Sequence, residues 1–221
     1  MKTLVVCATQ KSDPKETLLY QSLVPLKEKG AKFEAEFHTS NKEGLSKLYN
    51  NVMKRDRGYD CYVFVHDDVY IDDAFIFDKI EEGFQLYDII GVAGASDPKI
   101  KAPALWHLMT ERFNWSGSAG HFVSKDRIAI TSFGAMPAKV DILDGVLLAV
   151  NRMKYFKSGW QFNENYTFHH YDIASCLDAG KKKLTCGVLP IHIIHQSPGL
   201  RDIHDPVFTA SQTQFLKEYG S

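Results

Sequence analysis

The sequence predicts an α/β fold in which a mostly parallel, twisted sheet is flanked by helices within a single domain. Short apolar runs alternate with segments of helical periodicity over the first 95 residues, which is the pattern of a doubly wound sheet. The run at residues 62–65 is apolar throughout, as is typical of a strand covered on both faces. A chain of 221 residues is also long enough to bury a full core.

Local signals place the individual elements. Strands are expected at residues 4–8, 32–38, 62–66, 88–94, 184–189 and 191–195, and helices at residues 43–55, 73–86 and 171–179. A further helix is expected to begin at Asp13, its N-cap, with Pro14 in the first turn. Pro25 is expected to kink or end that helix, and Gly180 is the expected C-cap of the helix at 171–179.

The second half of the chain is less regular. Residues 96–137 are rich in glycine, serine and aromatic residues without clear periodicity, so we expect loops that carry specificity. Residues 140–150 are apolar and fit either a strand or a helix. The polar segment after His195 is expected to be a mobile lid or a partly ordered tail.

Composition and charge exclude some classes of function. The formal net charge of −1 gives no overall attraction to nucleic acid or to an anionic membrane. Basic clusters at 99–101 and 181–183 are local, and such runs are usually solvated. The four scattered cysteines favour a reducing compartment. No apolar run approaches the ~18 residues of a membrane span, so a soluble, cytoplasmic protein without membrane insertion is expected.

A polar cluster directly follows the apolar strand that ends near residue 66. His66, Asp67 and Asp68 stand at the carboxyl end of the expected sheet, where open α/β folds bind ligands. At the period of a strand, His66 and Asp68 point to one face, which leaves Asp67 to contact a sugar hydroxyl or a backbone group. An imidazole with carboxylates suits a divalent cation that also binds phosphate. The cluster therefore favours metal-dependent chemistry on a phosphorylated substrate.

Other polar residues fall near the ends of expected elements: Asp144, His169, His170, Asp172, His192 and His195. Each alone also fits a plainer role, as a helix N-cap for the acids or as a hydrogen-bonded structural residue for the histidines. Their conjunction at strand ends favours a common site. The sequence lacks the P-loop, the dinucleotide-binding glycine pattern and the G-x-S-x-G elbow.

Seven segments carry a family resemblance. They are N-x-x-G-L-S-x-x-Y-N at 41–50, FVHDDVYI at 64–71, GVAG at 91–94, LDGVLLAV at 143–150, W-x-F-N-E at 160–164, HHYD at 169–172 and IIHQSPG at 193–199. In order and spacing the chain resembles the GT-A glycosyltransferases. It is most similar to the small bacterial and phage glycosyltransferase-like group related to glycosyltransferase family two, over residues 1–199.

The resemblance implies a metal site. Asp68 matches the second acid of the family's D-x-D motif, which holds Mn²⁺ or Mg²⁺ on the donor diphosphate, and His66 stands in place of the first acid. His195 matches a late histidine that often completes the site. Such an ion is a Lewis acid that stabilises the leaving nucleoside diphosphate.

The resemblance also implies a base and contacts to the donor. Asp172 matches the general base of an inverting displacement, and Tyr171 replaces the glutamate that usually precedes it. A carboxylate is needed to accept the proton of the attacking hydroxyl. In the first turn of a helix, Asp172 is expected to stay ionised at the cost of weaker basicity. The expected donor-binding residues are Thr9, Asn41, Ser46 and Asp67.

On this basis we expect a metal-dependent, inverting hexosyl- or pentosyltransferase that uses a nucleotide sugar, such as a UDP-sugar. The catalytic domain is expected at 1–199, with a nucleotide-binding half at 1–95 and an acceptor half at 96–199, before the tail or lid at 200–221. The acceptor is a hydroxyl of a surface glycan, or of a hydroxylated base in phage DNA, in the cytoplasm of a bacterium or of a phage-infected host. Only the basic clusters support the DNA acceptor.

Two other functions stay open at this point. A metal-dependent phosphohydrolase would use the same acids to activate water. A non-catalytic sugar- or nucleotide-binding module would use them only as helix caps. Trp106, Trp115 and Trp160 offer flat faces to a sugar ring, or serve core packing instead.

Overall fold

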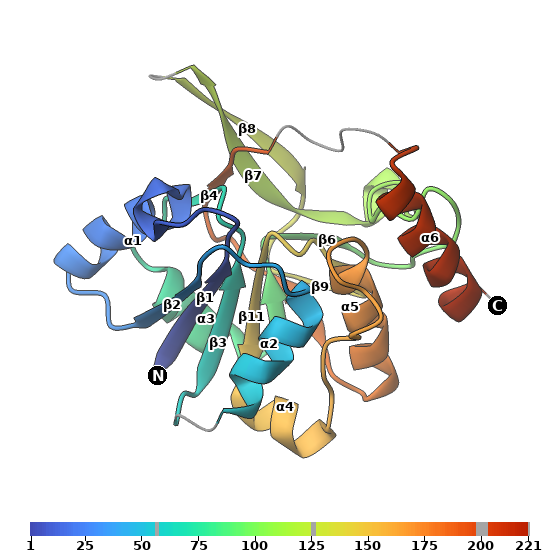
Figure 1. Ribbon diagram of the computed structural model, residues 1–221, viewed down its shortest axis with the longest axis horizontal. Coiled ribbons are helices and arrows are strands. Elements are labelled where there is room, and N and C mark those ends of the chain that lie inside the picture. The colour runs from blue at the N-terminus through green and yellow to red at the C-terminus, as the bar shows by residue number, and fades with distance from the viewer. Residues whose placement is uncertain (56–57, 125–126, 198–202, 221) are drawn as a thin grey trace.

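The computed structural model of the protein describes residues 1–55, 58–124, 127–197 and 203–220. These residues form an α/β fold of two sheets and flanking helices (Figure 1). Over the described ranges, the larger sheet has seven strands in the order β2-β1-β3-β11-β5-β12-β9. The smaller has six, with β10-β6-β7-β13-β4 in order and β8 paired to β7. The predicted α/β class with helices flanking a twisted sheet is confirmed, but the expectation of a mostly parallel sheet is wrong, because parallel and antiparallel pairings are mixed among the described strands.

The strands are β1 (Thr3–Ala8), β2 (Glu34–His38), β3 (Cys61–Val65), β4 (Val69–Ile71), β5 (Ile89–Gly91), β6 (Ala93–Ala95), β7 (Trp115–Ser124), β8 (Arg127–Gly134), β9 (Ala138–Val140), β10 (Ile142–Leu143), β11 (Leu147–Asn151), β12 (Cys186–Val188) and β13 (Ile193–His195). The helices are α1 (Leu18–Glu28), α2 (Leu45–Lys54), α3 (Ile76–Gly83), α4 (Arg152–Ser158), α5 (Tyr171–Lys181) and α6 (Pro206–Tyr219), with the 3₁₀ turns η1 (Pro14–Glu16) and η2 (Arg112–Asn114). Within the described residues, no helix combines the length and the apolar character needed to cross a membrane.

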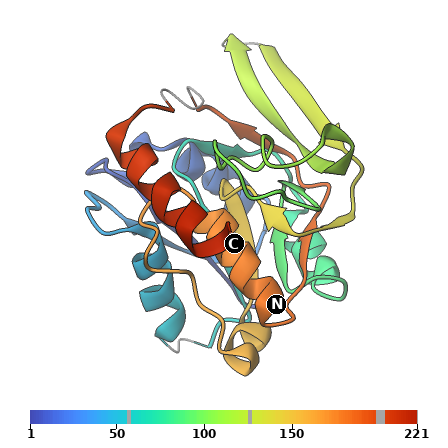
Figure 2. The ribbon, with the colours of Figure 1, turned by 90° about the vertical axis from the view of Figure 1, so that its right-hand side faces the viewer.

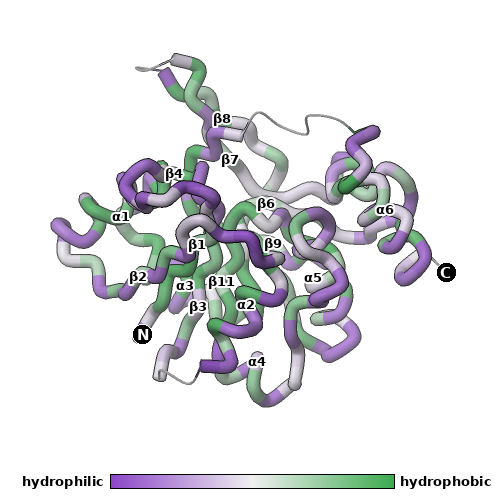
Figure 3. The backbone as a smooth tube through the Cα atoms, in the orientation of Figure 1, coloured by the Kyte–Doolittle hydropathy of each residue, from purple (hydrophilic) through white to green (hydrophobic). Residues whose placement is uncertain are grey.

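The first three strands build the parallel part of the larger sheet, with β1 between β2 and β3. Leu4 and Val6 of β1 belong to a core shared with α2 and α5, whereas Val5 and Cys7 belong to a core shared with α1 and α3. Hydrophobic segments therefore fill the centre of the molecule (Figure 3). Because both faces of the sheet are covered, β3 is buried along its whole length, as its apolar sequence predicts.

β11 interrupts the parallel order of the sheet. It pairs antiparallel with both β3 and β5, so the predicted strand at 88–94 does not lie beside β3. That segment forms β5 and β6, which belong to different sheets, and the chain passes from one to the other at Val92. The apolar stretch at 140–150 resolves into strands, ending with β11.

The segment at 96–137, expected to form loops, contains the long hairpin of β7 and β8, which projects from the body of the molecule (Figure 1). β7 also pairs with β6 and β13, which anchors the hairpin. Gly117 has φ 112°, and a Cβ there would lie 2.1 Å from the carbonyl oxygen of Val92. Glycine is required at this close approach, and it weakens the strand signal in the sequence.

Three predicted helix boundaries differ from the structure. Asp13 caps the short turn η1, and α1 begins only after Thr17, whose side chain accepts from the amide of Tyr20. Pro25 lies inside α1 without ending it, because the helix buries a face against the core on both sides of the proline. Gly180 lies inside α5, and Lys183 just beyond it has the left-handed φ of 61°.

The C-terminal segment expected as a lid or tail forms helix α6, which lies along α5 (Figure 2). Phe208 and Phe215 on α6 are buried. The ring of Phe215 stacks on His170, with centroids 5.3 Å apart, and Ser211 Oγ lies 2.8 Å from His170 Nδ1. Because His170 is the N-cap of α5, α6 supports the start of that helix. The expected boundary between 199 and 200 lies outside the described residues.

Replacement of Phe215 by alanine is expected to lower the free energy of unfolding by about 3–5 kcal/mol, since it leaves a cavity beneath α6. Urea denaturation measures this change. Val207→Ala on the exposed side of α6 is the control, with an expected effect within about 0.5 kcal/mol. Equal, small effects of both substitutions would show that α6 is not part of the folded core.

Candidate active site

The turn after β3 carries the central residues of the site. The amide of His66 donates to the carbonyl of Val146, which ties the end of β3 to the loop before β11. Asp67 and Asp68 form the turn into β4. The buried strand thus delivers the three polar side chains to the carboxyl edge of the parallel strands, where the sequence places them.

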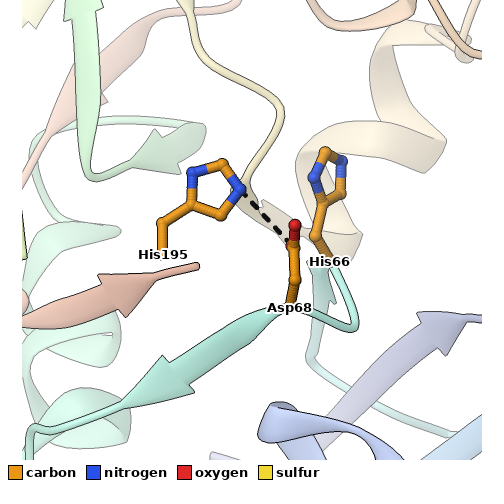
Figure 4. Close-up of side chains that lie close together, drawn as sticks. All are labelled: His66, Asp68 and His195. Atoms are coloured by element: carbon orange, nitrogen blue, oxygen red, sulfur yellow. Dashed lines mark ion pairs between the residues drawn. The ribbon is translucent and has the colours of Figure 1, made fainter. Parts of the chain in front are cut away.

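Strand pairing brings His195 to this turn. β13 runs antiparallel to β4 with His195 opposite Val69, and the amide of Gln196 donates to the carbonyl of Asp68. His195 Nε2 therefore lies 3.3 Å from Asp68 Oδ1 (Figure 4). One ligand atom each of His66, Asp68 and His195 lies within 4.8 Å of the others.

This cluster fits a divalent cation. Asp68 Oδ1 is buried and receives no hydrogen bond among the described residues, although His195 Nε2 is near it. A buried carboxylate oxygen without a donor is costly, and a cation between the carboxylate and the imidazoles would satisfy it. Two imidazole nitrogens and one carboxylate oxygen are a donor set for a borderline metal ion.

The three side chains also shift one another's proton affinity. Burial raises the pKa of Asp68, but the adjacent imidazole of His195 and the charge of His66 outweigh it and the net shift is downward. For His195, burial alone would lower the pKa, but the Asp68 carboxylate raises the pKa by more than burial lowers it. The net shift of the His195 pKa is therefore upward. Burial lowers the pKa of His66, against the attraction of the nearby carboxylates. The cluster therefore pairs an ionised Asp68 with its two histidines.

The structure brings three of the expected donor-binding residues together. Thr9 Oγ1 donates to Asp67 Oδ2 at 2.5 Å, and the amide of Asn41 donates to the carbonyl of Thr9 at 2.9 Å. Asp67 thus turns toward the end of β1, while its neighbours His66 and Asp68 turn toward His195 and form the cation cluster with it. Ser46 is placed differently: it is buried in α2 and its hydroxyl donates to the carbonyl of Tyr166.

Asp172 lies in the first turn of α5, beside the loop that precedes β11. Its Oδ2 accepts from the amide of Gly145 at 2.7 Å, and its Oδ1 from the amide of Ile173 at 2.8 Å. Burial raises the pKa of Asp172 to about 7, aided by the charge of Asp144, and together they outweigh the amide donors. The expectation of weak basicity at the helix start is therefore wrong, because desolvation exceeds the effect of the helix amides.

The sequence pattern of a "glycosyltransferase like family" matches residues 4–219. The chain belongs to this family. A comparison with curated proteins finds no match.

Two solved structures with TM-scores above 0.5 agree on the fold of this family member. Protein A197 from STIV aligns with a TM-score of 0.53 and 14% identity over 93% of this chain and 100% of that one. TarS from S. aureus aligns with a TM-score of 0.51 and 13% identity over 99% of this chain and 39% of that one. Drosophila beta1,4-galactosyltransferase 7, in complex with xylobiose, aligns less closely, with a TM-score of 0.49 and 11% identity over 91% of this chain and 67% of that one. The fold is that of the GT-A glycosyltransferases.

Two residues of the site had no role in the sequence prediction. Asp144 follows an apolar run, which marked it as a candidate, and it accepts from Trp106 Nε1 and from the amide of Val146. Tyr171 was noted as a departure from the family pattern, and its phenol contacts His66 and Gly145. The contacts of Tyr171 arise from the packing of α5 against the β10–β11 loop, and the contact of Asp144 with Trp106 arises from a residue 38 positions away, so neither gave a signal in the sequence.

The tryptophans divide between core and site. Trp160 is buried, and its Nε1 donates to the carbonyl of Ser175, so it serves packing. Trp106 packs edge-on against Trp115, with centroids 5.6 Å apart. Because Trp106 also donates to Asp144, this aromatic pair borders the site.

Two cavities lie away from the cation cluster. One of about 570 Å³ is lined by residues of α2 and α5 together with 159–164, and another of about 540 Å³ lies beside α1 and α3. Among the described residues that line them, Trp160 was considered as a face for a sugar ring, and none is a predicted metal ligand, base or donor-binding residue. The candidate site is therefore recognised by the chemistry of its residues and not by either of these cavities.

Replacement of Asp68 by asparagine is expected to weaken Mn²⁺ binding by more than about 100-fold. Loss of a residue that only supports a ligand costs about 10–100-fold, and Asp68 would be a ligand itself. Isothermal titration with Mn²⁺ alone measures the affinity. Asp72→Asn is a matched control, since Asp72 also lies 3.3 Å from a histidine nitrogen, that of His192. Retention of wild-type Mn²⁺ affinity in D68N would contradict the assignment.

Proposed function

We propose that this member of the glycosyltransferase-like family is a metal-dependent, inverting enzyme that transfers a hexosyl or pentosyl unit from a nucleotide sugar to a hydroxyl acceptor. The observation that carries the proposal is the cluster of His66, Asp68 and His195, joined through one loop to a basic carboxylate, Asp172. Metal ligands and a base on neighbouring elements are the groups that glycosyl transfer requires.

His66, Asp68 and His195 would hold the cation. Two imidazoles in this donor set favour Mn²⁺ over Mg²⁺, which prefers oxygen ligands. When bound, the ion supplies a Lewis acid that stabilises the nucleoside diphosphate as it leaves. Before binding, Asp68 carries the negative charge that attracts the ion, since its pKa is lowered.

Thr9, Asn41 and Asp67 would bind the nucleotide. They form a connected polar edge at the ends of β1, β2 and β3. Asp67 joins this edge to the cation cluster, because its sequence neighbours His66 and Asp68 belong to that cluster. A carboxylate oxygen there accepts a hydrogen bond from a ribose hydroxyl, and UDP is the nucleotide we propose. Ser46 would act indirectly, by fixing α2 to the backbone of Tyr166.

Asp172 would act as the general base. It removes the proton from the acceptor hydroxyl while that oxygen attacks the anomeric carbon and the bond from carbon to the diphosphate oxygen breaks. Its pKa of about 7 matches a base that works near neutral pH. The amides of Gly145 and Ile173 hold the carboxylate in place.

A glycan is the acceptor we propose, rather than a modified base in DNA. The basic clusters that would attract DNA are partly neutralised within the protein. Lys99 pairs with Asp97 at 2.7 Å, and Lys181 pairs with Asp178 at 2.8 Å and lies over the ring of Tyr219. The nearby carboxylates lower the net positive charge of both clusters, which weakens their attraction for DNA phosphates. The four cysteines are free and buried, which supports a cytoplasmic setting.

Asp172→Asn is expected to abolish sugar transfer while donor affinity stays nearly unchanged, because the carboxylate acts on the acceptor. Transfer to an oligosaccharide acceptor and calorimetric binding of UDP-sugars with Mn²⁺ measure the two effects. Asp78→Asn, in the first turn of α3, is the control and should retain activity. Donor hydrolysis that needs no acceptor would favour a phosphohydrolase, and ligand binding indifferent to Mn²⁺ would favour a binding module.

The transfer rate should depend on pH through Asp172. The base must be ionised, so kcat is expected to fall by about tenfold per pH unit below the pKa of about 7, and to level off above it. The rate is measured at saturating donor, acceptor and Mn²⁺, because protonation of His195 would also release the cation. A rate independent of pH across this range would rule out Asp172 as the base.

A further inference from the structure

Tyr171 occupies a junction between the metal cluster and the base. Its ring is buried at the start of α5, and its hydroxyl donates to the carbonyl of Gly145 at 2.8 Å. The same oxygen lies 3.0 Å from His66 Nε2. The phenol therefore touches both the loop that holds Asp172 and an imidazole of the cation cluster.

The hydrogen-bond inventory of these groups fixes the position of one proton. A phenol has a single proton, and a carbonyl oxygen only accepts. The Tyr171 proton must therefore point to Gly145, since two oxygens at 2.8 Å without a proton between them would repel. The contact between Tyr171 and His66 is then a hydrogen bond only if Nε2 of the imidazole carries the proton. In the neutral ring, the lone pair is left on Nδ1.

The ring of His66 is oriented accordingly. In Figure 4, one nitrogen of His66 is directed toward the side of Asp68 and His195, and the other points away from them. The nitrogen that points away is the one available to Tyr171, which comes from α5. A metal ion binds the nitrogen with the lone pair, and the hydrogen bond of the other nitrogen decides which one that is.

We propose that Tyr171 is a positioning residue that holds His66 in the Nε2-protonated form and thereby presents Nδ1 to the cation. This inference rests on the proposed metal-dependent function and adds the group that orients one ligand. Tyr171 does not touch the reacting atoms in this role. It acts through His66.

Gly145 makes this arrangement possible. A Cβ at this position would lie 2.3 Å from Tyr171 Oη and 2.9 Å from Asp172 Cβ, so any larger residue would push α5 away. Its carbonyl receives the phenol and its amide donates to Asp172. A single residue thus sets the positions of the histidine's partner and of the base, which ties the two halves of the site together.

The test is Tyr171→Phe, which keeps the ring and removes only the hydroxyl. Without the hydroxyl of Tyr171, nothing in this contact favours the Nε2-protonated tautomer of neutral His66 over the Nδ1-protonated one. The Mn²⁺ dissociation constant is therefore expected to rise by about 10–100-fold. Electron paramagnetic resonance of free Mn²⁺ measures it without donor or acceptor. Tyr166→Phe is the matched control, since it removes a buried phenol bonded to Glu218 on α6 and should leave Mn²⁺ affinity unchanged.

A second measurement reads the proton directly. Long-range ¹H–¹⁵N spectra of the metal-free protein at mildly alkaline pH should show His66 protonated on Nε2, and a mixture of both forms in Y171F. Loss of the signal in His66→Gln assigns it. Wild-type protein that binds Mn²⁺ as tightly as Y171F, or a His66 protonated on Nδ1, would overturn this inference alone. Failure of the wild type to bind Mn²⁺ would overturn the proposed function as well.

Discussion

The antiparallel pairing of β4 with β13 is the constraint on which the site depends. β4 begins directly after the acidic turn and is three residues long, so its register with the distant β13 fixes which residue stands beside Asp68. With His195 opposite Val69, the imidazole reaches the carboxylate. A shift by one residue would turn His195 to the other face of the sheet. More than a hundred residues of chain separate the partners, and the two short strands alone align them.

A second junction, at Gly145, links this cluster to the chemistry proposed for α5. Burial gives Asp172 a basic carboxylate there although backbone amides of the loop and of α5 donate to it. Those same amides hold its orientation. Desolvation and hydrogen bonding thus act in opposite directions on proton affinity but together on geometry. In the proposed function this combination gives a base that is both fixed in place and able to accept a proton near neutral pH.

Much of the fold was predictable because it depends on local or periodic signals. The apolar strand β3, the amphipathic helix α2 and the strand–helix alternation of the first 95 residues all appear as expected. The hairpin of β7 and β8 was missed, since its glycines and serines pack against other strands rather than showing a period of their own. α6 was missed for a related reason: its burial depends on only a few residues, among them Phe208 and Phe215, that contact α5.

The sequence by itself determined the types of ligand and base, and their order along the chain. His66, Asp68, His195 and Asp172 could be selected because imidazoles and carboxylates stand near strand and helix ends. Only the tertiary structure decided which of these side chains meet, that the Ser46 hydroxyl donates to the backbone carbonyl of Tyr166, and that Tyr171 contacts His66. The physical reason is that distances and proton affinities depend on strand register and on burial, and both arise from contacts between residues far apart in the chain.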